Sequence, residues 1–268
     1  MDKAELYNFS RVYEYLIICL VALLASAITL FSGFGLGTVL VPAFALFFPI
    51  GMAIGLTAIV HFLNNLFKLF LFGKNANRAI VIKFGVPSLV ASFVGALVLT
   101  MLDKAPAIYA YQLQGHHFEI TPVKLIISLL LFGFVILEVV PKLASMQFHP
   151  RHLVAGGLLS GFFGGVSGNQ GALRSAFLLK AGLTKETFIA TGVVIACMVD
   201  VARLAVYSER ILTVKHENLA LVAAATTAAF TGTFIGNRLV KKITLLSFRY
   251  FVAAMLFIFA LLLGAGIL

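Results

Sequence analysis

The chain alternates between long apolar stretches and short polar segments. Apolar residues dominate ten stretches, at residues 15–31, 39–48, 52–72, 79–102, 123–140, 152–163, 172–179, 187–207, 218–239 and 245–268. A helix that spans the hydrocarbon core of a bilayer needs about 20 predominantly apolar residues. Several stretches reach that length, so the pattern predicts a helical bundle that crosses a membrane several times.

Glycine-rich segments interrupt this pattern at two places. The first is residues 32–37, with the sequence SGFGLG, and the second is residues 164–171, with the sequence GGVSGNQG. Glycine at this density disfavours a continuous helix, so the backbone is expected to open in both segments. The shorter pieces beside each interruption cannot cross the bilayer alone.

The two interruptions belong to a longer internal similarity. The matched segments are 31–44 with 162–177, 65–68 with 200–203, and 92–95 with 233–236. The offset between the two copies drifts by only a few residues, which loops of different length explain. The similarity therefore predicts a first membrane repeat at residues 1–140, a linker at 141–151 and a second membrane repeat at 152–268.

The positions of the basic residues indicate how the repeats are oriented. The chain is 61% hydrophobic and 11% charged, with 20 Lys and Arg against 10 Asp and Glu, which excludes an ordinary soluble domain. Three of the cations lie inside apolar segments. If each interrupted stretch crossed the membrane fully, the other 17 would divide 9 to 8 between the two sides; if each were a re-entrant hairpin, they would divide 11 to 6.

Because cytoplasmic loops carry an excess of Lys and Arg, the hairpin arrangement is favoured. We therefore expect an all-α polytopic membrane protein with two inverted repeats. Each repeat has a Gly-broken re-entrant helical hairpin followed by three transmembrane helices, and both termini lie outside the cytoplasm.

The interruptions also predict a binding site. Non-helical backbone at membrane depth is tolerated only where protein or water covers it, so equivalent breaks in two repeats indicate a central site. The backbone N–H groups at the start of the half-helix after each break attract anions. Arg174 follows the second break by three residues, and an intramembrane arginine normally faces a cavity or a partner. The alternatives are that the glycines only permit close helix packing and that Arg174 forms an ion pair or reaches the interface.

Further polar residues share one face of each following helix. His61, Asn65 and Lys68 have helical spacing in the first repeat, and Asp200 and Arg203 occupy the matching helix of the second. His61 or Asp200 could couple proton movement to transport, whereas the alternatives are a hydrogen-bonded helix contact for His61 and an internal ion pair for Asp200. The predicted substrate-binding residues are Arg174, Asn169, Gln170, Ser167, Gly168, Gly35, Gly37, Asn65 and His61, and the predicted gating or coupling residues are Asp200, Arg203 and Lys68.

Other classes of protein are less well supported by the sequence. His116 and His117 have no nearby cysteine or clustered carboxylates, so neither a metal nor another cofactor is expected. The cations are spread among short loops, which argues against nucleic-acid binding. An anion channel stays open as an alternative. An intramembrane hydrolase with Ser167 as nucleophile and His61 as base is a weaker one, because residues 165–169 lack the second glycine of G-x-S-x-G. We expect the protein not to be an enzyme.

The twin glycine-rich segments resemble those of the TauE/SafE family of sulfite and organosulfonate exporters. The resemblance is carried by residues 32–42 and 161–171, in a chain of this size with two halves, and covers residues 14–268. It implies a multi-pass exporter in the bacterial inner membrane for small sulfur-containing anions such as sulfite or sulfoacetate. We expect alternating access of the two repeats, with the anion and the lipid bilayer as partners; the large apolar surface is compatible with a homodimer. The second segment departs from the first in lacking its proline and in carrying Arg174 two residues before the equivalent position.

Overall fold

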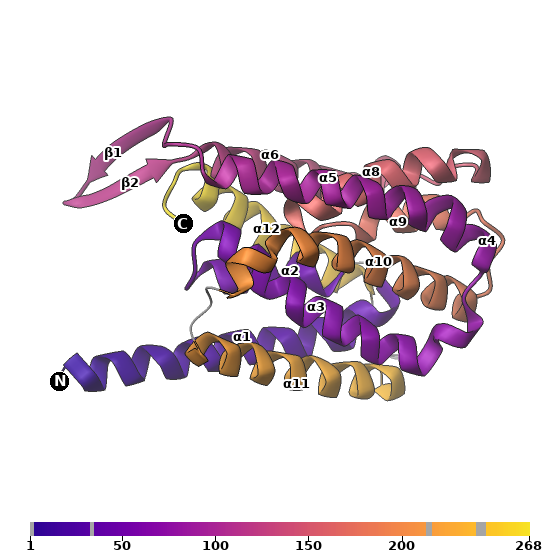
Figure 1. Ribbon diagram of the computed structural model, residues 1–268, viewed down its shortest axis with the longest axis horizontal. Coiled ribbons are helices and arrows are strands. Elements are labelled where there is room, and N and C mark those ends of the chain that lie inside the picture. Colours follow the sequence, from indigo (N-terminus) through magenta and orange to yellow (C-terminus); the bar gives the residue numbers. More distant parts are fainter. Residues whose placement is uncertain (1–2, 33–34, 213–215, 240–244) are drawn as a thin grey trace.

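The computed structural model describes residues 3–32, 35–212, 216–239 and 245–268 and is a bundle of helices with one small β-hairpin (Figure 1). The helices longer than five residues are α1 (Lys3–Ser32), α2 (Leu36–Ala45), α3 (Ile50–Phe72), α5 (Val86–Asp103), α6 (Pro122–Val139), α8 (Leu153–Ser167), α9 (Gly171–Leu178), α10 (Lys185–Leu212), α11 (His216–Leu239) and α12 (Leu245–Gly264). The short elements are η1 (Gly73–Asn75), α4 (Arg78–Ile80), η2 (Val81–Gly85), β1 (Tyr109–Leu113), β2 (His116–Ile120), α7 (Pro141–Ala144) and η3 (Pro150–His152).

Six helical segments of the described chain are long and apolar enough to cross a membrane. They are Arg11–Thr29, Ile50–Leu71, Arg78–Asp103, Pro122–Val139, Lys185–Ser208 and Asn218–Arg238. The prediction of a helical polytopic membrane protein is confirmed, but the hairpin of β1 and β2 was not predicted. Arg11–Thr29 is itself long enough to cross, whereas the sequence predicted that this segment belongs to a re-entrant hairpin. Helix α1 is longer than the apolar stretch at residues 15–31 predicted, because neither glycine nor proline occurs between Lys3 and Ser32 to end it.

Two helix pairs, α1–α2 and α8–α9, form hairpins that open toward opposite ends of the bundle. A Cβ atom on Gly51, at the start of α3 where the chain leaves α2, would lie 2.6 Å from the Asp103 carboxylate at the end of α5. This is the end of the bundle where β1, β2 and the start of α1 lie (Figure 1). In the other pair, Phe148 precedes α8 and stacks on Phe177 near the end of α9, with ring centroids 4.2 Å apart. Phe148 and Phe177 pack with Ile80 of α4, and α4 lies at the end of the bundle far from β1 and β2 (Figure 1).

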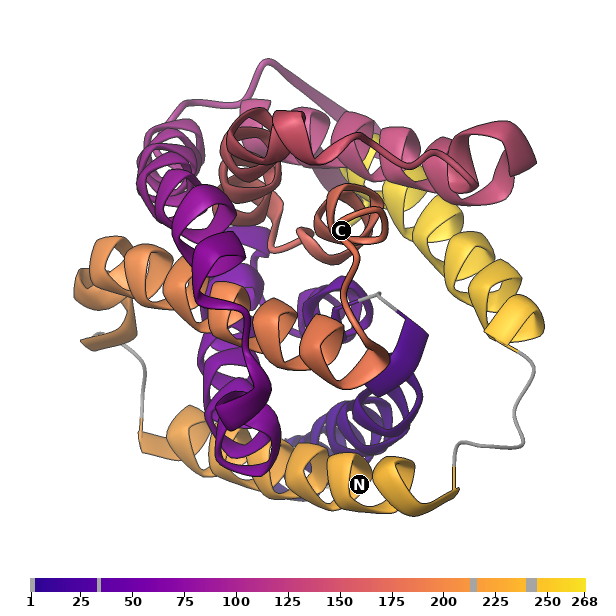
Figure 2. The same ribbon diagram turned by 90° about the vertical axis from the view of Figure 1, so that its right-hand side faces the viewer.

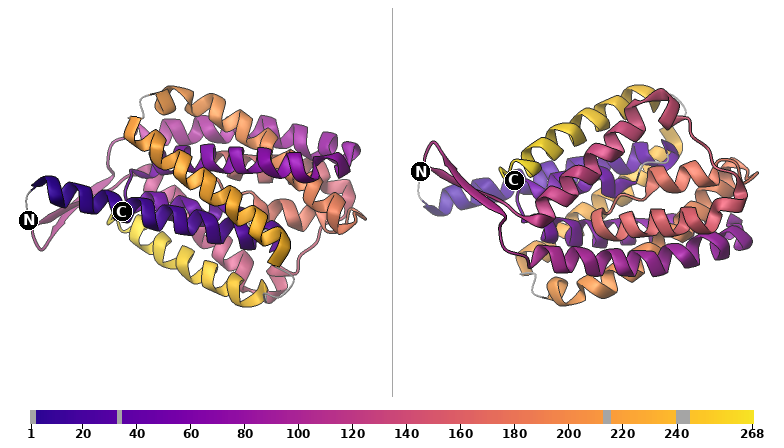
Figure 3. Two further views of the ribbon diagram at one scale, coloured as in Figure 1. Left: turned by 90° about the horizontal axis from the view of Figure 1, so that it is seen from below. Right: turned by 90° about the horizontal axis from the view of Figure 1, so that it is seen from above.

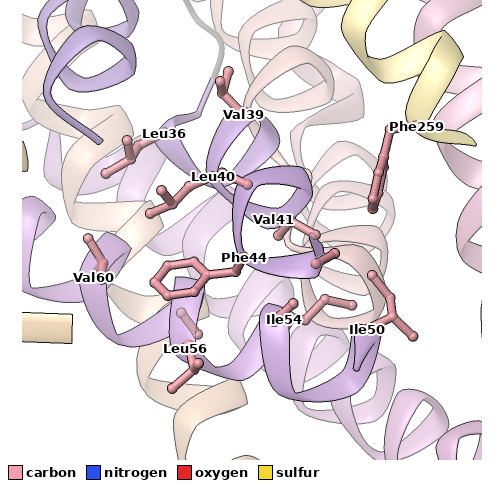
Figure 4. Close-up of a cluster of buried hydrophobic side chains, with 14 of the residues drawn as sticks. Leu36, Val39, Leu40, Val41, Phe44, Ile50, Ile54, Leu56, Val60 and Phe259 are labelled. Atoms are coloured by element: carbon pink, nitrogen blue, oxygen red, sulfur yellow. The ribbon is translucent and has the colours of Figure 1, made fainter. Parts of the chain in front are cut away.

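The short helices α2 and α9 lie at the centre of the bundle and the longer helices enclose them (Figure 2). All ten residues of α2 are buried. Its apolar side chains, including Leu40 and Phe44, pack against Ile54 and Leu56 of α3 and belong to a core cluster that extends to Phe259 of α12 (Figure 4). This packing explains why a ten-residue helix too short to span the bilayer is stable inside the protein.

Helix α8 packs against α5 through a row of glycines. A Cβ atom on Gly157, Gly161 or Gly165 would collide with a backbone carbonyl oxygen of α5 or of η2 before it. Only glycine permits this close approach. Helix α8 consequently stays regular through Gly165 to Ser167, and the prediction that the backbone opens from Gly164 onward is wrong for the first half of that segment.

The same type of contact joins α11 to α1 on the opposite face of the bundle (Figure 3). A Cβ atom on Gly232 would meet the carbonyl of Leu23, and one on Gly236 would meet that of Ala27. The alternative that glycine serves close helix packing therefore applies to part of the second glycine-rich segment, and the reversal of the backbone there begins only after Ser167.

Candidate functional site

The two interruptions meet at the centre of the bundle. Gly168 ends α8 in the left-handed conformation, with φ +78°, and Gly35 is the N-cap of α2. A Cβ atom on Gly37 would lie 3.1 Å from the carbonyl oxygen of Gly168. Residues 33 and 34 of the first interruption lie outside the described residues. The described parts of both breaks are thus in direct contact, and a side chain at position 37 would press on the Gly168 carbonyl.

Beside the breaks, α3 and α10 share a buried carboxylate. Asp200 Oδ2 lies 2.6 Å from His61 Nδ1 and accepts a hydrogen bond of 3.1 Å from Asn65 Nδ2. Asp200 Oδ1 accepts a 3.0 Å hydrogen bond from Arg203 Nε and lies 2.8 Å from Arg203 Nη2. Asp200 and Arg203 are completely buried. The ion pair that sequence reasoning kept as an alternative for Asp200 is the arrangement in the structure.

A cavity of about 60 Å³ lies next to this cluster. Helices α1, α3, α9 and α10 and the start of α2 enclose it, and its polar lining includes His61, Asn65, Lys68 and Arg174. Gly35 lines it as well. Five predicted site residues, from both halves of the chain, therefore surround one cavity.

Two cations at this cavity lack a counter-charge. In the part of the chain that the structure describes, no carboxylate forms an ion pair with Lys68 or Arg174, and Arg174 Nη1 is buried without a hydrogen-bond partner. Lys68 Nζ lies 3.3 Å from the side-chain oxygen of Asn64 when that amide is oriented to satisfy its neighbours. Since Asp200 pairs directly with Arg203 and His61, the cavity is lined by two cations that no described carboxylate contacts.

Three other predicted binding residues lie away from this cavity. Ser167 Oγ donates to the Phe163 carbonyl at 2.9 Å and accepts from the Asn169 N–H at 3.3 Å, so it caps the end of α8. Asn169 lines a separate cavity of about 10 Å³, and the buried side chain of Gln170 has no hydrogen-bond partner among the described residues. Because α8 remains helical to Ser167, these residues fall in the chain reversal, whereas Arg174 lies one turn later and reaches the larger cavity.

The contacts of Ser167 also bear on the hydrolase alternative. The hydrogen bonds of Ser167 are to Phe163 and Asn169, while His61 Nδ1 contacts Asp200. Among the described residues, no hydrogen bond joins the Ser167 hydroxyl to the His61 ring, so the nucleophile and base of the hydrolase alternative are not paired. Likewise, the described residues include no group of three or more His, Cys, Asp or Glu side chains placed to hold a metal ion.

Sequence reasoning missed a polar network that joins α1, α3 and α11. Ser26 Oγ and Thr233 Oγ1 lie 2.7 Å apart, and both contact the Asn64 amide, which in turn faces Lys68. A single hydroxyl on an apolar helix can bond to its own backbone, so the sequence does not indicate that Ser26 and Thr233 contact another helix. This network holds the Asn64 amide that faces Lys68.

Comparison with known proteins gives a match over nearly the whole chain. A family model described as "Sulfite exporter TauE/SafE" matches residues 18–263. No curated protein and no solved structure matches the chain. The matched region includes both interruptions and every residue that lines the cavity.

Proposed function

Because the chain belongs to the sulfite exporter TauE/SafE family, and is thus a multi-pass membrane transporter for a small anion, we propose that it exports sulfite or a sulfonate such as sulfoacetate. We place it in the bacterial inner membrane and assign it to the secondary transporters. The observation that carries this proposal is the cavity at which Lys68 and Arg174 form no ion pair with a carboxylate of the described residues.

The charge of the cavity supports an anionic ligand. An isolated cation within a membrane-spanning bundle costs at least about 2.5 kcal/mol, and a bound anion would offset that cost for both Lys68 and Arg174. The planar guanidinium of Arg174 suits two oxygens of one acid group. The cavity, at about 60 Å³, exceeds several-fold the roughly 10–15 Å³ that a water molecule needs, so it has room for a compact oxyanion.

The arrangement of the helices supports alternating access by two inverted repeats, residues 1–140 and 152–268. The hairpins α1–α2 and α8–α9 open toward opposite ends of the bundle, and each packs against a helix of the other half through glycines (Figure 3). Asn65 and Asp200, which the internal similarity equates, contact each other. A site enclosed by both halves would face either side in turn as one half moves against the other.

Transport by the purified protein in liposomes tests this proposal. We expect saturable counterflow of radiolabelled sulfite or sulfoacetate, with a large loss of flux in Arg174→Gln. His117→Gln, which alters an exposed residue of β2, is the control and should retain flux. Unitary conductance steps would instead indicate an anion channel. Absence of flux for both anions, in liposomes that contain folded protein, would contradict the proposal.

A further inference from the structure

The contact between His61 and Asp200 determines which ring nitrogen carries the hydrogen. Asp200 accepts hydrogen bonds from Arg203 Nε and Asn65 Nδ2 and forms an ion pair with Arg203. This donor set requires an ionised carboxylate, which can only accept hydrogen bonds. At 2.6 Å from Asp200 Oδ2, His61 Nδ1 must therefore be the donor. In the neutral ring, Nε2 then has a lone pair and no hydrogen.

His61 Nε2 lies on the side of the ring toward the first break. A Cβ atom on Gly35 would lie 3.6 Å from Nε2, and both Gly35 and His61 line the cavity. Asn65 Nδ2, which donates to Asp200, lies 3.0 Å from Nδ1 and 3.4 Å from Nε2. These two distances place it over the face of the ring, so it does not occupy the in-plane lone pair of Nε2. The cavity lined by two cations thus also presents an acceptor atom, and an acceptor repels the oxygens of an anion.

We infer that binding of the anion is coupled to the uptake of one proton by His61 at Nε2. This inference rests on the proposed function. The proton comes from the solution on the side where the anion enters and adds to the Nε2 lone pair, which converts the imidazole into an imidazolium. Nε2 becomes a donor toward the anion while Nδ1 keeps its hydrogen bond to Asp200. When the anion leaves, the proton returns to the solution on the side of exit.

The charges around His61 explain why the proton and the anion require each other. Arg203 on α10 and Lys68 on α3 are cations that oppose a further positive charge on the ring, and Arg174 on α9 lines the same cavity. Asp200 is the carboxylate that touches the ring, and Arg203 shares it. The charge of a bound anion would offset this repulsion, so protonation and anion binding each favour the other by the same free energy.

Titration calorimetry in pairs of buffers with different ionisation enthalpies measures the number of protons exchanged. Wild type, His61→Gln and Lys68→Gln would be titrated with sulfoacetate and with sulfite, and His117→Gln serves as a control for loss of an exposed histidine. We expect wild type to take up nearly one more proton per anion than His61→Gln. Lys68→Gln should bind more weakly but retain this uptake. Comparison with His61→Gln cancels any proton that sulfite itself gains or loses.

Wild type alone provides a second measurement that does not depend on the folding of a variant. Sulfoacetate does not titrate near neutrality, so its Kd should rise with pH between about pH 5 and 8, by up to about tenfold per pH unit. Anion binding without proton uptake and with a pH-independent Kd would overturn the coupling and leave the proposed function intact. If neither anion binds to folded protein, the proposed function fails and the coupling fails with it.

Discussion

Arg203 and Arg174 lie on neighbouring helices of the same half of the chain, but only Arg203 forms an ion pair with a described carboxylate. Arg203 is completely buried and faces Asp200, three residues earlier on α10. Arg174 faces the cavity, and no described carboxylate pairs with it. The first cation is neutralised inside the protein, whereas the second leaves its charge available to a ligand. A buried cation whose counter-charge is missing is therefore the one that points to an anionic ligand.

Lys68 resembles Arg174 in this comparison. Its ammonium group faces the neutral Asn64 amide and the cavity, so hydrogen bonding orients the group while its charge stays uncompensated. Ser26 and Thr233 hold that amide from two other helices. Hydrogen bonds from three helices therefore fix the position of the Lys68 ammonium group, but none of these bonds neutralises its charge.

Removal of the counter-charge from Arg203 should give the largest effect. Asp200→Asn leaves a buried guanidinium without compensation, and we expect the free energy of unfolding to fall by about 3–5 kcal/mol. Equilibrium unfolding in mixed micelles measures this. The double variant Asp200→Asn/Arg203→Gln should recover much of the loss, because it removes the uncompensated charge too. A single variant as stable as wild type would show that Asp200 does not compensate Arg203.

Arg174→Gln should weaken anion binding without lowering the free energy of unfolding. Its charge has no partner in the described structure, so removal should leave the unliganded protein as stable as wild type or more so. The loss should appear in binding: a charge-assisted hydrogen bond contributes about 1.5–3 kcal/mol, which corresponds to at least about a tenfold rise in the Kd for sulfite or sulfoacetate. Calorimetric Kd and unfolding should be measured on the same preparation. A destabilised variant with unchanged affinity would place Arg174 in the same class as Arg203.

Much of the fold could be predicted from the sequence, because the bilayer imposes simple rules of length and polarity. The candidate spans that contain α3, α5, α6, α10 and α11 follow the apolar stretches within a few residues. The extent of the second break could not be predicted, because glycine either opens a helix or lets another helix approach. Gly165 lets α5 approach, and this is evident only from the position of α5 in the structure.

The site could be predicted in part for a similar reason. Intramembrane polar residues are few, so Lys68, Arg174, Asp200 and His61 were identified from their positions alone. Sequence could not tell which cation was compensated, since both an ion pair within α10 and a ligand site fitted the spacing of Asp200 and Arg203. Nor could it separate Arg174 from Asn169, because the direction of each side chain depends on where the chain reverses.

A new carboxylate beside Arg174 would convert it into a compensated cation like Arg203. A Cβ atom on Gly192 would lie 3.5 Å from Arg174 Nε, an ordinary contact distance, so Gly192→Asp can place an acid next to the guanidinium. We expect anion binding to weaken by about 1–2 kcal/mol, or roughly 5- to 30-fold, with no loss of stability. Gly192→Ala is the control, since it adds the Cβ atom without the charge. If both variants raise the Kd equally, the added volume of the side chain explains the change, and the proposed neutralisation of Arg174 by the new carboxylate is contradicted.

The smallest effect should be the difference in stability between two glycine variants, one of which borders Arg203. Gly168 has φ +78°, and a Cβ atom there would lie 3.0 Å from Arg203 Nη1. Gly182 has a similar φ of +70° but nothing within 4 Å of an added Cβ atom. An alanine in the left-handed conformation costs roughly 1–2 kcal/mol, so both Gly168→Ala and Gly182→Ala should lose about this much unfolding free energy. Any excess loss in Gly168→Ala measures how tightly the compensated guanidinium is held. If the two losses are equal, the Arg203 side chain can move away from the new methyl group, and the Arg203–Asp200 pair is less rigid than its burial indicates.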